Sequence, residues 1–154
     1  MIYLDNAATT RVSAEVFEAM KPYFCEQYAN PSAIYSFAGS AAKAVDEARR
    51  QSAALIGAQP NEIYFTAGGS ESDNWAVKAA AEASAAKGKH LITSVIEHHA
   101  VLHTFEYLEK HGFEVTYLPV DEYGIVKIDA LEAAIRKDTT LISVMAANNE
   151  IGTI

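Results

Sequence analysis

The sequence places residues that could bind anions or move protons next to expected strand–helix junctions. The segment Thr66 to Asn74, TAGGSESDN, stands between a short expected strand and a long expected helix. Its two adjacent glycines allow a sharp turn and a close approach to a ligand. Free N–H groups at a helix start, together with the helix dipole, favour an anion such as phosphate. We expect Ser70 to cap this helix, with Asp73 at capping-box spacing. The glycines match neither the dinucleotide fingerprint nor the P-loop, so a plain tight turn explains them equally well.

A second group, Glu97-His98-His99, follows an expected strand over residues 90–95. Ligands of open α/β sheets bind at the C-terminal ends of the strands. A histidine there can stack on an aromatic cofactor or move protons, although the motif alone favours an ordinary loop histidine. A metal site is the weaker interpretation, because adjacent histidines on a strand point to opposite faces and no third ligand stands at a useful spacing.

A third polar group, Asn148-Asn149-Glu150, comes directly after an apolar segment. Two amides there either satisfy the loop backbone or bind a ligand, and the motif alone favours the structural role.

The opening segment 3–10 and the segment Asn30-Pro31-Ser32 are, in isolation, ordinary loops. If the strands are parallel, the three motifs near Ser70, His98 and Asn149 lie along one edge of the sheet. A single cofactor site needs that arrangement.

Apolar spacing and Gly/Pro positions predict the elements that carry these motifs. Ser13 caps the first helix, Pro22 kinks or splits it, and Gly57 and Gly88 end the second and third helices. The expected order is helix 13–28, helix 36–56, strand 62–65, helix 70–87, strand 90–95, helix 100–112, strand 114–120, a turn at 121–124, helix 129–137 and strand 140–146. Strands that alternate with helices predict an α/β fold with a mainly parallel sheet covered on both faces.

Composition excludes several functions. The 154 residues, one domain or a piece of one, carry a net charge of −8, whereas a nucleic-acid-binding surface needs clustered Lys and Arg. A single cysteine, Cys25, allows neither an internal disulfide nor a thiolate-rich metal site. The start lacks the basic and apolar segments of a signal peptide, and no apolar run approaches a bilayer span. We therefore expect a soluble, cytoplasmic protein that binds neither nucleic acid nor membrane.

Five motifs together resemble one family. In order, YLDNAATT, NPSA, FTAGGSESDN, EHHAV and NNEIG are similar to cysteine desulfurases of the NifS and IscS type. These are class V aminotransferases, pyridoxal 5'-phosphate (PLP) enzymes of fold type I. The family usually has Thr where Ser70 stands, and either hydroxyl can bond a phosphate oxygen. The resemblance implies that residues 1–154 are the N-terminal part of a three-layer α/β/α large domain, with its C-terminal half and the small domain outside these residues.

The resemblance also implies roles for single residues. Gly69 and Ser70 would hold the PLP phosphate, His98 would stack on the pyridine ring and take part in proton transfer, and Asn149 would bond the phenolic oxygen. The residues expected near the substrate are Asn6, Ala7 and Asn30. The family reaction converts L-cysteine to L-alanine and a persulfide on a catalytic cysteine. The sulfur then passes to an acceptor or scaffold protein for iron–sulfur cluster assembly.

In the family, the Schiff-base lysine stands in a Ser-x-His-Lys motif that these residues do not contain, and Cys25 does not match the catalytic cysteine. We therefore expect the 154 residues alone to be inactive and to bind PLP weakly or not at all, and the strand at 62–65 to lack its neighbours. The expected partner is a second copy in a homodimer or a complementing polypeptide. The alternatives are a selenocysteine lyase or other class V PLP enzyme fragment, a non-catalytic dimerisation or binding remnant, and a nucleotide-binding α/β domain suggested only by the glycine turn.

Overall fold

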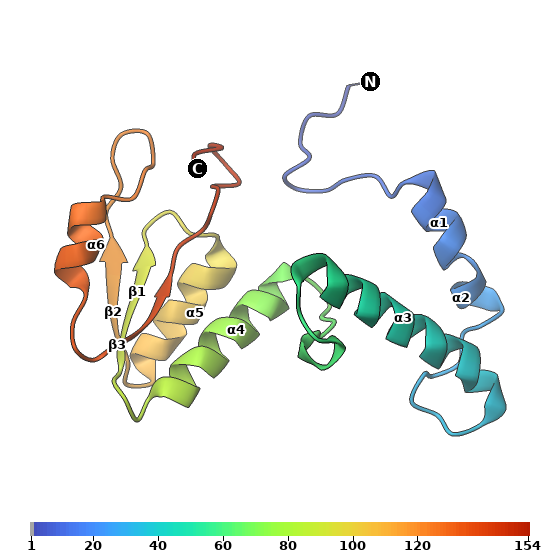
Figure 1. Ribbon diagram of the computed structural model, residues 1–154. Helices are drawn as coiled ribbons and strands as arrows, with labels where there is room; N and C mark the ends of the chain where they lie inside the picture. Colours follow the sequence, from blue (N-terminus) through green and yellow to red (C-terminus); the bar gives the residue numbers. More distant parts are fainter. Residues whose placement is uncertain (1) are drawn as a thin grey trace. The chain divides into compact units, whose positions relative to one another are not determined.

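The computed structural model describes residues 2–154 and divides the chain into two compact units, Met1–Phe65 and Thr66–Ile154 (Figure 1). The first unit is helical. Its elements are α1 (Ala14–Met20), α2 (Pro22–Cys25), the 3₁₀ turns η1 (Ser36–Ala38) and η2 (Pro60–Glu62), and α3 (Gly39–Ile56). The second unit contains α4 (Gly69–Ser84), β1 (His90–Ser94), α5 (His99–Lys110), β2 (Glu114–Leu118), α6 (Ile128–Ala134) and β3 (Thr139–Ser143).

Sequence signals set the helix ends of the first unit. Ser13 Oγ accepts the Val16 N–H at 3.3 Å and caps α1, as expected. Pro22 splits the expected first helix, because proline has no N–H to donate and is tolerated only in a first turn. The second piece ends at Cys25, three residues before the expected end. Gly57 ends α3 at φ +70°, a left-handed conformation that glycine adopts without strain.

The expected strand over residues 62–65 is wrong. This segment has no regular structure, and no strand among residues 2–154 pairs with it. It is held through Arg49, whose guanidinium donates to the Ile63 carbonyl and lies 5.0 Å from the centre of the Phe65 ring. A strand requires ladder hydrogen bonds to a neighbour as well as alternating apolar residues, so the sequence pattern alone does not form one.

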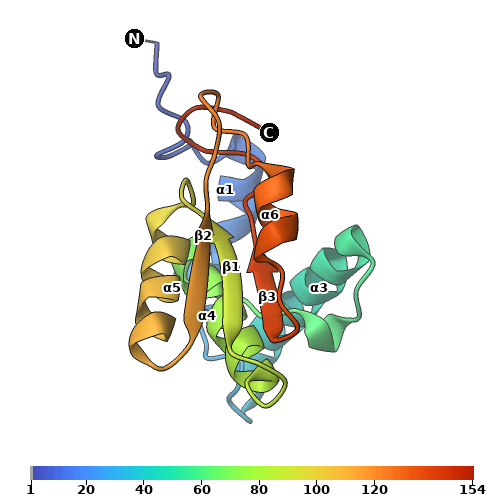
Figure 2. The same ribbon diagram turned by 90° about the vertical axis from the view of Figure 1, so that its left-hand side faces the viewer.

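The second unit is built on the expected parallel sheet. Its strand order is β2-β1-β3, and both neighbours pair with β1 in parallel. All five residues of β1 are buried. Helices α4 and α5 lie on one face and α6 on the other (Figure 2). The expected strands extend one to three residues too far, and α4 ends at Ser84, so a turn separates it from Gly88.

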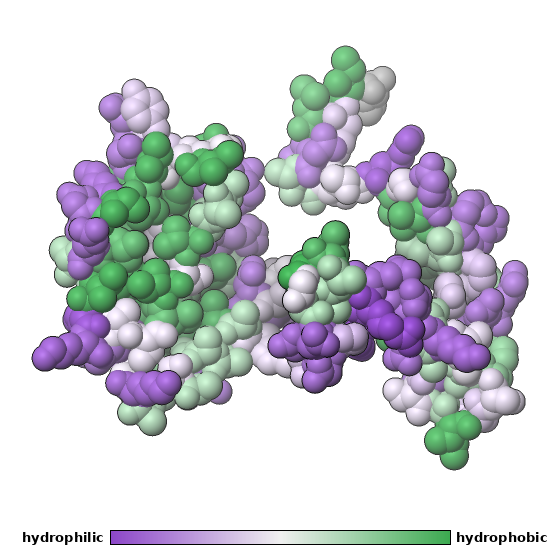
Figure 3. Space-filling model, viewed as in Figure 1, coloured by the Kyte–Doolittle hydropathy of each residue, from purple (hydrophilic) through white to green (hydrophobic). Residues whose placement is uncertain are grey.

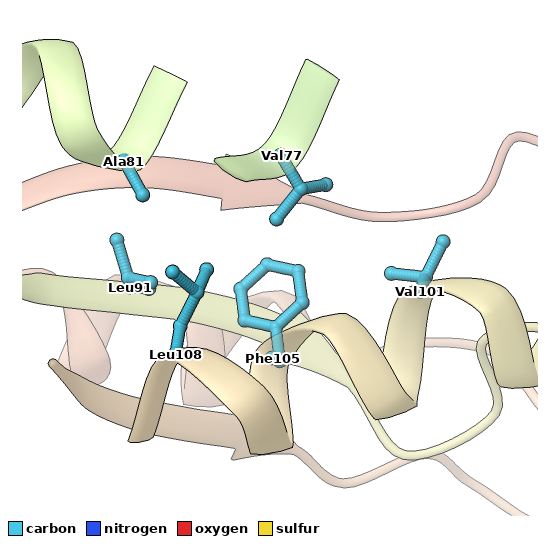
Figure 4. Packing of buried hydrophobic residues seen from close by; sticks show 6 residues of the cluster. All are labelled: Val77, Ala81, Leu91, Val101, Phe105 and Leu108. Carbon is cyan, nitrogen blue, oxygen red and sulfur yellow. The ribbon is translucent and has the colours of Figure 1, made fainter. Parts of the chain in front are cut away.

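The core of the second unit lies between β1 and the two helices on its face (Figure 4). Leu91 of β1 faces apolar side chains that recur every three or four residues along each helix, which places them on one helix face. Full burial of a leucine or phenylalanine stabilises a fold by roughly 1.5–3 kcal/mol. The cluster consists of Val77 and Ala81 of α4, Leu91 of β1, and Val101, Phe105 and Leu108 of α5.

The expected turn after β2 is also present. The Gly124 N–H donates to the Asp121 carbonyl at 3.1 Å, and the Asp121 carboxylate accepts two further backbone N–H groups. Among residues 2–154, no helix has both the length and the apolar character needed to cross a membrane.

Candidate functional site

The glycine turn leads directly into α4. Gly68 has an extended backbone, and its carbonyl accepts the Ser72 N–H at 3.2 Å, the first hydrogen bond of the helix. Ser70 therefore lies within the first turn, so the expected cap at Ser70 and the capping box through Asp73 are wrong. The helix starts earlier because glycine itself is an accepted N-cap residue.

This turn has the features that a phosphate group needs. No side chain caps α4, so the first N–H groups of the helix keep their capacity to donate. A Cβ built on Gly68 or Gly69 would meet no atom within 4 Å, so the space beside the backbone is open. The carboxylate in this first turn belongs to Glu71, and its Oε2 accepts the Ala67 N–H at 2.6 Å. The turn thus fits an anion that approaches the backbone.

His98 is the N-cap of α5. Its Nδ1 accepts the Ala100 N–H at 3.1 Å, so the neutral ring carries its proton on Nε2. The ring is exposed and can meet a ligand. His99 is also exposed, and its ring stacks on His103 with centroids 5.3 Å apart. Residues 2–154 contain no group of three or more His, Cys, Asp or Glu side chains arranged to hold a metal ion.

The two asparagines after β3 have different surroundings. Asn148 is buried; its Oδ1 accepts the N–H groups of Glu150 and Ile151 at 2.8 and 3.0 Å, and its Nδ2 donates to the Ile96 carbonyl at 2.9 Å. Asn148 therefore shapes the loop. Asn149 is exposed, and its Nδ2 donates to the Glu150 carboxylate at 3.2 Å. The sequence left both roles open for the pair, and the structure assigns the loop-building role to Asn148.

Glu97 has a role that the sequence did not reveal. Its carboxylate is buried, and Oε1 accepts both the Ser94 hydroxyl at 2.9 Å and the Met145 N–H at 2.7 Å. It thus joins the segment after β1 to the segment after β3. The available signal was an acidic residue directly after two apolar residues, Val95 and Ile96, since a carboxylate is costly to bury unless it is paired.

Three predicted site segments meet at the C-terminal edge of the sheet. The Asn74 amide donates to the carbonyls of Ser70 and Ala100, so the first turns of α4 and α5 lie side by side. Glu97 and Asn148 connect the loop that carries Asn149 to the segment before His98. Gly69, Ser70, His98 and Asn149 therefore share one edge, and their roles toward a cofactor stay predictions.

The predicted substrate residues lie in the first unit. Asn6 and Ala7 stand in an exposed turn in which the Ala8 N–H donates to the Asp5 carbonyl at 3.2 Å. Asn30 is exposed, and its Oδ1 accepts the Ser32 N–H at 2.9 Å. These contacts describe two turns, so the substrate role of the three residues stays a prediction.

Known proteins share this sequence along its whole described length. Residues 2–154 match the model of the aminotransferase class-V family. The chain is 61% identical over 153 residues to the cysteine desulfurase IscS of Methanosarcina thermophila, an alignment that covers 99% of this chain and 38% of the relative. It is 57% identical to the cysteine desulfurase IscS of Dictyoglomus turgidum, in an alignment that covers 99% of this chain and 39% of that relative.

Solved structures agree. A NifS-like protein, 44% identical, superposes with a TM-score of 0.94 over 99% of this chain and 42% of that protein. The protein in the structure of SspA in complex with cysteine is 45% identical, with a TM-score of 0.89 over 97% of this chain and 43% of that protein. The chain thus spans about two fifths of the length of the relatives it matches. The chain belongs to the class-V aminotransferase family, within which it resembles cysteine desulfurases of the IscS type.

Proposed function

We propose that these residues form the phosphate-binding and ring-binding side of a PLP site in a cysteine desulfurase. The observation that carries the proposal is the shared edge at which the uncapped glycine turn of α4 meets the exposed ring of His98. The family is PLP-dependent, and PLP carries both a phosphate, which suits the glycine turn, and an aromatic ring, which suits His98. When bound, PLP supplies an electron sink for bonds that break at the substrate α-carbon.

Each residue contributes one physical function. The N–H groups at Gly69 and Ser70, with the Ser70 hydroxyl, bind the phosphate at the positive end of the α4 dipole. The His98 ring would hold the pyridine ring by aromatic contact, and its Nε2 is the nitrogen available to exchange a proton with a ligand. Asn149 presents an amide donor that suits the phenolic oxygen, while Asn148 and Glu97 keep its loop in place.

L-cysteine is the proposed substrate, and Asn6, Ala7 and Asn30 are proposed to lie near it. The similarity to cysteine desulfurases and the solved complex of SspA with cysteine, a 45% identical protein, support cysteine as the substrate. The products would be L-alanine and an enzyme persulfide whose sulfur passes to an acceptor or scaffold protein. We place this activity in the cytoplasm.

We infer that the 154 residues alone, the N-terminal part of the large domain, do not complete the reaction. The Schiff base needs a lysine amine with a free lone pair. Lys78, which lines the same groove along α4 as Ser70, is engaged with Asn74 at 2.9 Å and with the Tyr107 ring at 4.3 Å.

A second polypeptide segment or a second copy is therefore part of the proposal. Apolar side chains gather on the face of the second unit that Figure 3 shows. Ile128, Ile142 and Val144 are among the exposed large apolar residues of the second unit. Large exposed apolar patches are typical of surfaces that contact another chain.

A chimera tests the proposal. This chain replaces the matched 153 residues of the Methanosarcina thermophila relative, and PLP affinity and alanine release from L-cysteine are measured. We expect the chimera to bind PLP and release alanine, and the 154-residue chain alone to release none. Ser70→Ala should weaken PLP binding about tenfold, whereas Ser84→Ala, at the other end of α4, should not. A folded chimera that binds no PLP would show the proposal to be wrong.

A further inference from the structure

The side-chain amide of Asn74 joins two helices at the candidate site. Asn74 lies in the second turn of α4 and is half-buried. Its Nδ2 donates to the Ser70 carbonyl at 2.9 Å and to the Ala100 carbonyl at 3.3 Å. A primary amide carries two N–H donors, and here the acceptors belong to the first turns of two different helices. One side chain therefore fixes the spacing between the starts of α4 and α5.

One acceptor belongs to a residue with a proposed cofactor contact, and the other belongs to a residue that holds such a residue in place. Ser70 is the residue proposed to hold the phosphate. Ala100 donates its own N–H to His98 Nδ1, so the position of Ala100 sets the position of the His98 ring. A shift of either carbonyl relative to the other would change the distance between the phosphate turn and the ring face. A rigid cofactor that bridges the two tolerates little such change.

Lys78 fixes the orientation of this amide. Its ammonium donates to Asn74 Oδ1 at 2.9 Å and lies 4.3 Å from the centre of the Tyr107 ring. A flipped amide would turn its N–H groups toward the ammonium and its oxygen toward two carbonyl oxygens. Electrostatic repulsion at both ends disfavours that state, so Lys78 keeps both donors on the two helices.

We propose that Asn74 is a positioning residue, which holds the phosphate turn at Ser70 and the ring of His98 at a fixed separation. Lys78 supports it by fixing the direction of the amide. The importance of that separation for PLP rests on the function proposed above, but the mechanical link between Asn74 and His98 does not.

The first experiment measures that link without cofactor. In the cofactor-free chimera, which is the parent protein of the variants below, ¹⁵N NMR of the histidine rings reports whether the His98 proton resides on Nε2. Asn74→Asp keeps the side-chain size but removes both donors. We expect it to lower the Nε2–H fraction of His98, because no donor from α4 then fixes the position of Ala100. Thr104→Val is the matched control, since Thr104 Oγ1 donates to the same Ala100 carbonyl at 2.7 Å from within α5. It should leave the His98 tautomer unchanged.

The second experiment measures PLP affinity in a double-mutant cycle. Asn74→Ala should weaken PLP binding tenfold or more in the parent protein, but less than threefold when His98 is already alanine. Such non-additivity indicates that Asn74 acts through His98. Thr104→Val should combine additively with His98→Ala. Lys78→Met keeps both Asn74 donors but removes the ammonium that fixes the direction of the amide. We expect this variant to lose only part of its affinity for PLP.

The outcomes separate this inference from the proposed function. An unchanged His98 tautomer in Asn74→Asp, or additive losses of affinity in the cycle, would overturn the positioning role. A parent protein that binds no PLP would overturn the proposed function instead, and the NMR experiment would then decide on Asn74 alone.

Discussion

The Glu97 carboxylate accepts the Met145 backbone N–H at 2.7 Å and thereby fastens the end of β1 to the end of β3. The same oxygen accepts the Ser94 hydroxyl at 2.9 Å, and the side chain is buried. Hydrogen bonds to a charged acceptor are stronger than neutral ones, and a buried N–H that loses its acceptor costs the full desolvation penalty. This single carboxylate therefore contributes both to stability and to the geometry of the candidate site.

Replacement of Glu97 by alanine should lower the free energy of unfolding by about 2–3 kcal/mol, because two donors lose their acceptor. Glu97→Gln should cost less, since the amide oxygen still accepts. Urea denaturation measures both, and amide hydrogen exchange at Met145 should accelerate in the alanine variant. Glu106→Ala removes an exposed carboxylate of α5 and should change little. Equal stability of the Glu97 and Glu106 alanine variants would contradict this role.

Local sequence signals predicted most elements of this fold. Ser13, Pro22 and Gly57 set helix ends through groups on their own backbone or side chain, so no distant partner was needed. The segment 62–65 has the same kind of apolar pattern as the real strands. Its failure to form a strand depends on the lack of a neighbouring strand among residues 2–154, which a local pattern does not encode.

The candidate site shows the same division between features that sequence signals predict and features that depend on distant contacts. Its location at the strand ends followed from the order of the elements, because parallel strands bring their C-terminal ends to one edge. The separate roles of Asn148 and Asn149, and the role of Glu97, depend on contacts between segments about fifty residues apart. Residue types alone do not specify such contacts. The cap at Ser70 failed for a smaller reason, since α4 starts at the preceding glycine.

Gly88 should not tolerate a side chain. A Cβ built there would lie 2.2 Å from the Asp138 carbonyl oxygen, and the obstacle is backbone, which moves at a high cost. Gly88→Ala should therefore destabilise the second unit by roughly 2–3 kcal/mol through overpacking. Gly39→Ala is the control, because a Cβ there meets nothing within 4 Å. Thermal and urea unfolding would check the pair, and equal stability would refute the steric argument.

His90 holds the central strand to both neighbours at the opposite edge of the sheet. The side chain is 1% exposed, and its Nδ1 and Nε2 lie 2.7 and 2.8 Å from the hydroxyl oxygens of Thr139 and Thr116. Burial lowers the pKa of His90, and the charge of Arg136 lowers it further. The carboxylates of Asp138 and Glu114 act in the opposite direction. The native state therefore favours the neutral ring.

This lowered pKa predicts acid sensitivity. An unfolded histidine takes up a proton near pH 6.5, so below that pH the unfolded state binds more protons than the native state. The stability that the neutral His90 contributes is present above pH 6.5 and is lost as the pH falls through the native pKa. The free energy of unfolding then falls by at most about 1.4 kcal/mol per pH unit. Urea denaturation from pH 7 to pH 5 should show a shallower dependence for His90→Gln than for the parent.

Thr93 offers a stabilising substitution. Its side chain is fully buried in β1, and its hydroxyl has no hydrogen-bond partner in the structure. An unpaired buried hydroxyl costs free energy, and valine has nearly the same shape without it. Thr93→Val should therefore raise the free energy of unfolding by about 1 kcal/mol. Thr104→Val removes a hydroxyl that donates at 2.7 Å and should not stabilise. A destabilised Thr93→Val protein would reveal an acceptor for this hydroxyl.

Two variants of His98 separate its structural role from its proposed role toward the cofactor. Asparagine is a good N-cap residue, so His98→Asn should keep the start of α5 intact, whereas His98→Ala should cost about 1 kcal/mol of stability. Neither variant has an aromatic ring, so both should lose the same factor in PLP affinity if the ring stacks on the cofactor. Unfolding curves and PLP titrations of the two proteins give both quantities. If His98→Asn bound PLP as tightly as the parent, His98 would be only a helix cap, and the ring-binding part of the proposed site would have to lie elsewhere.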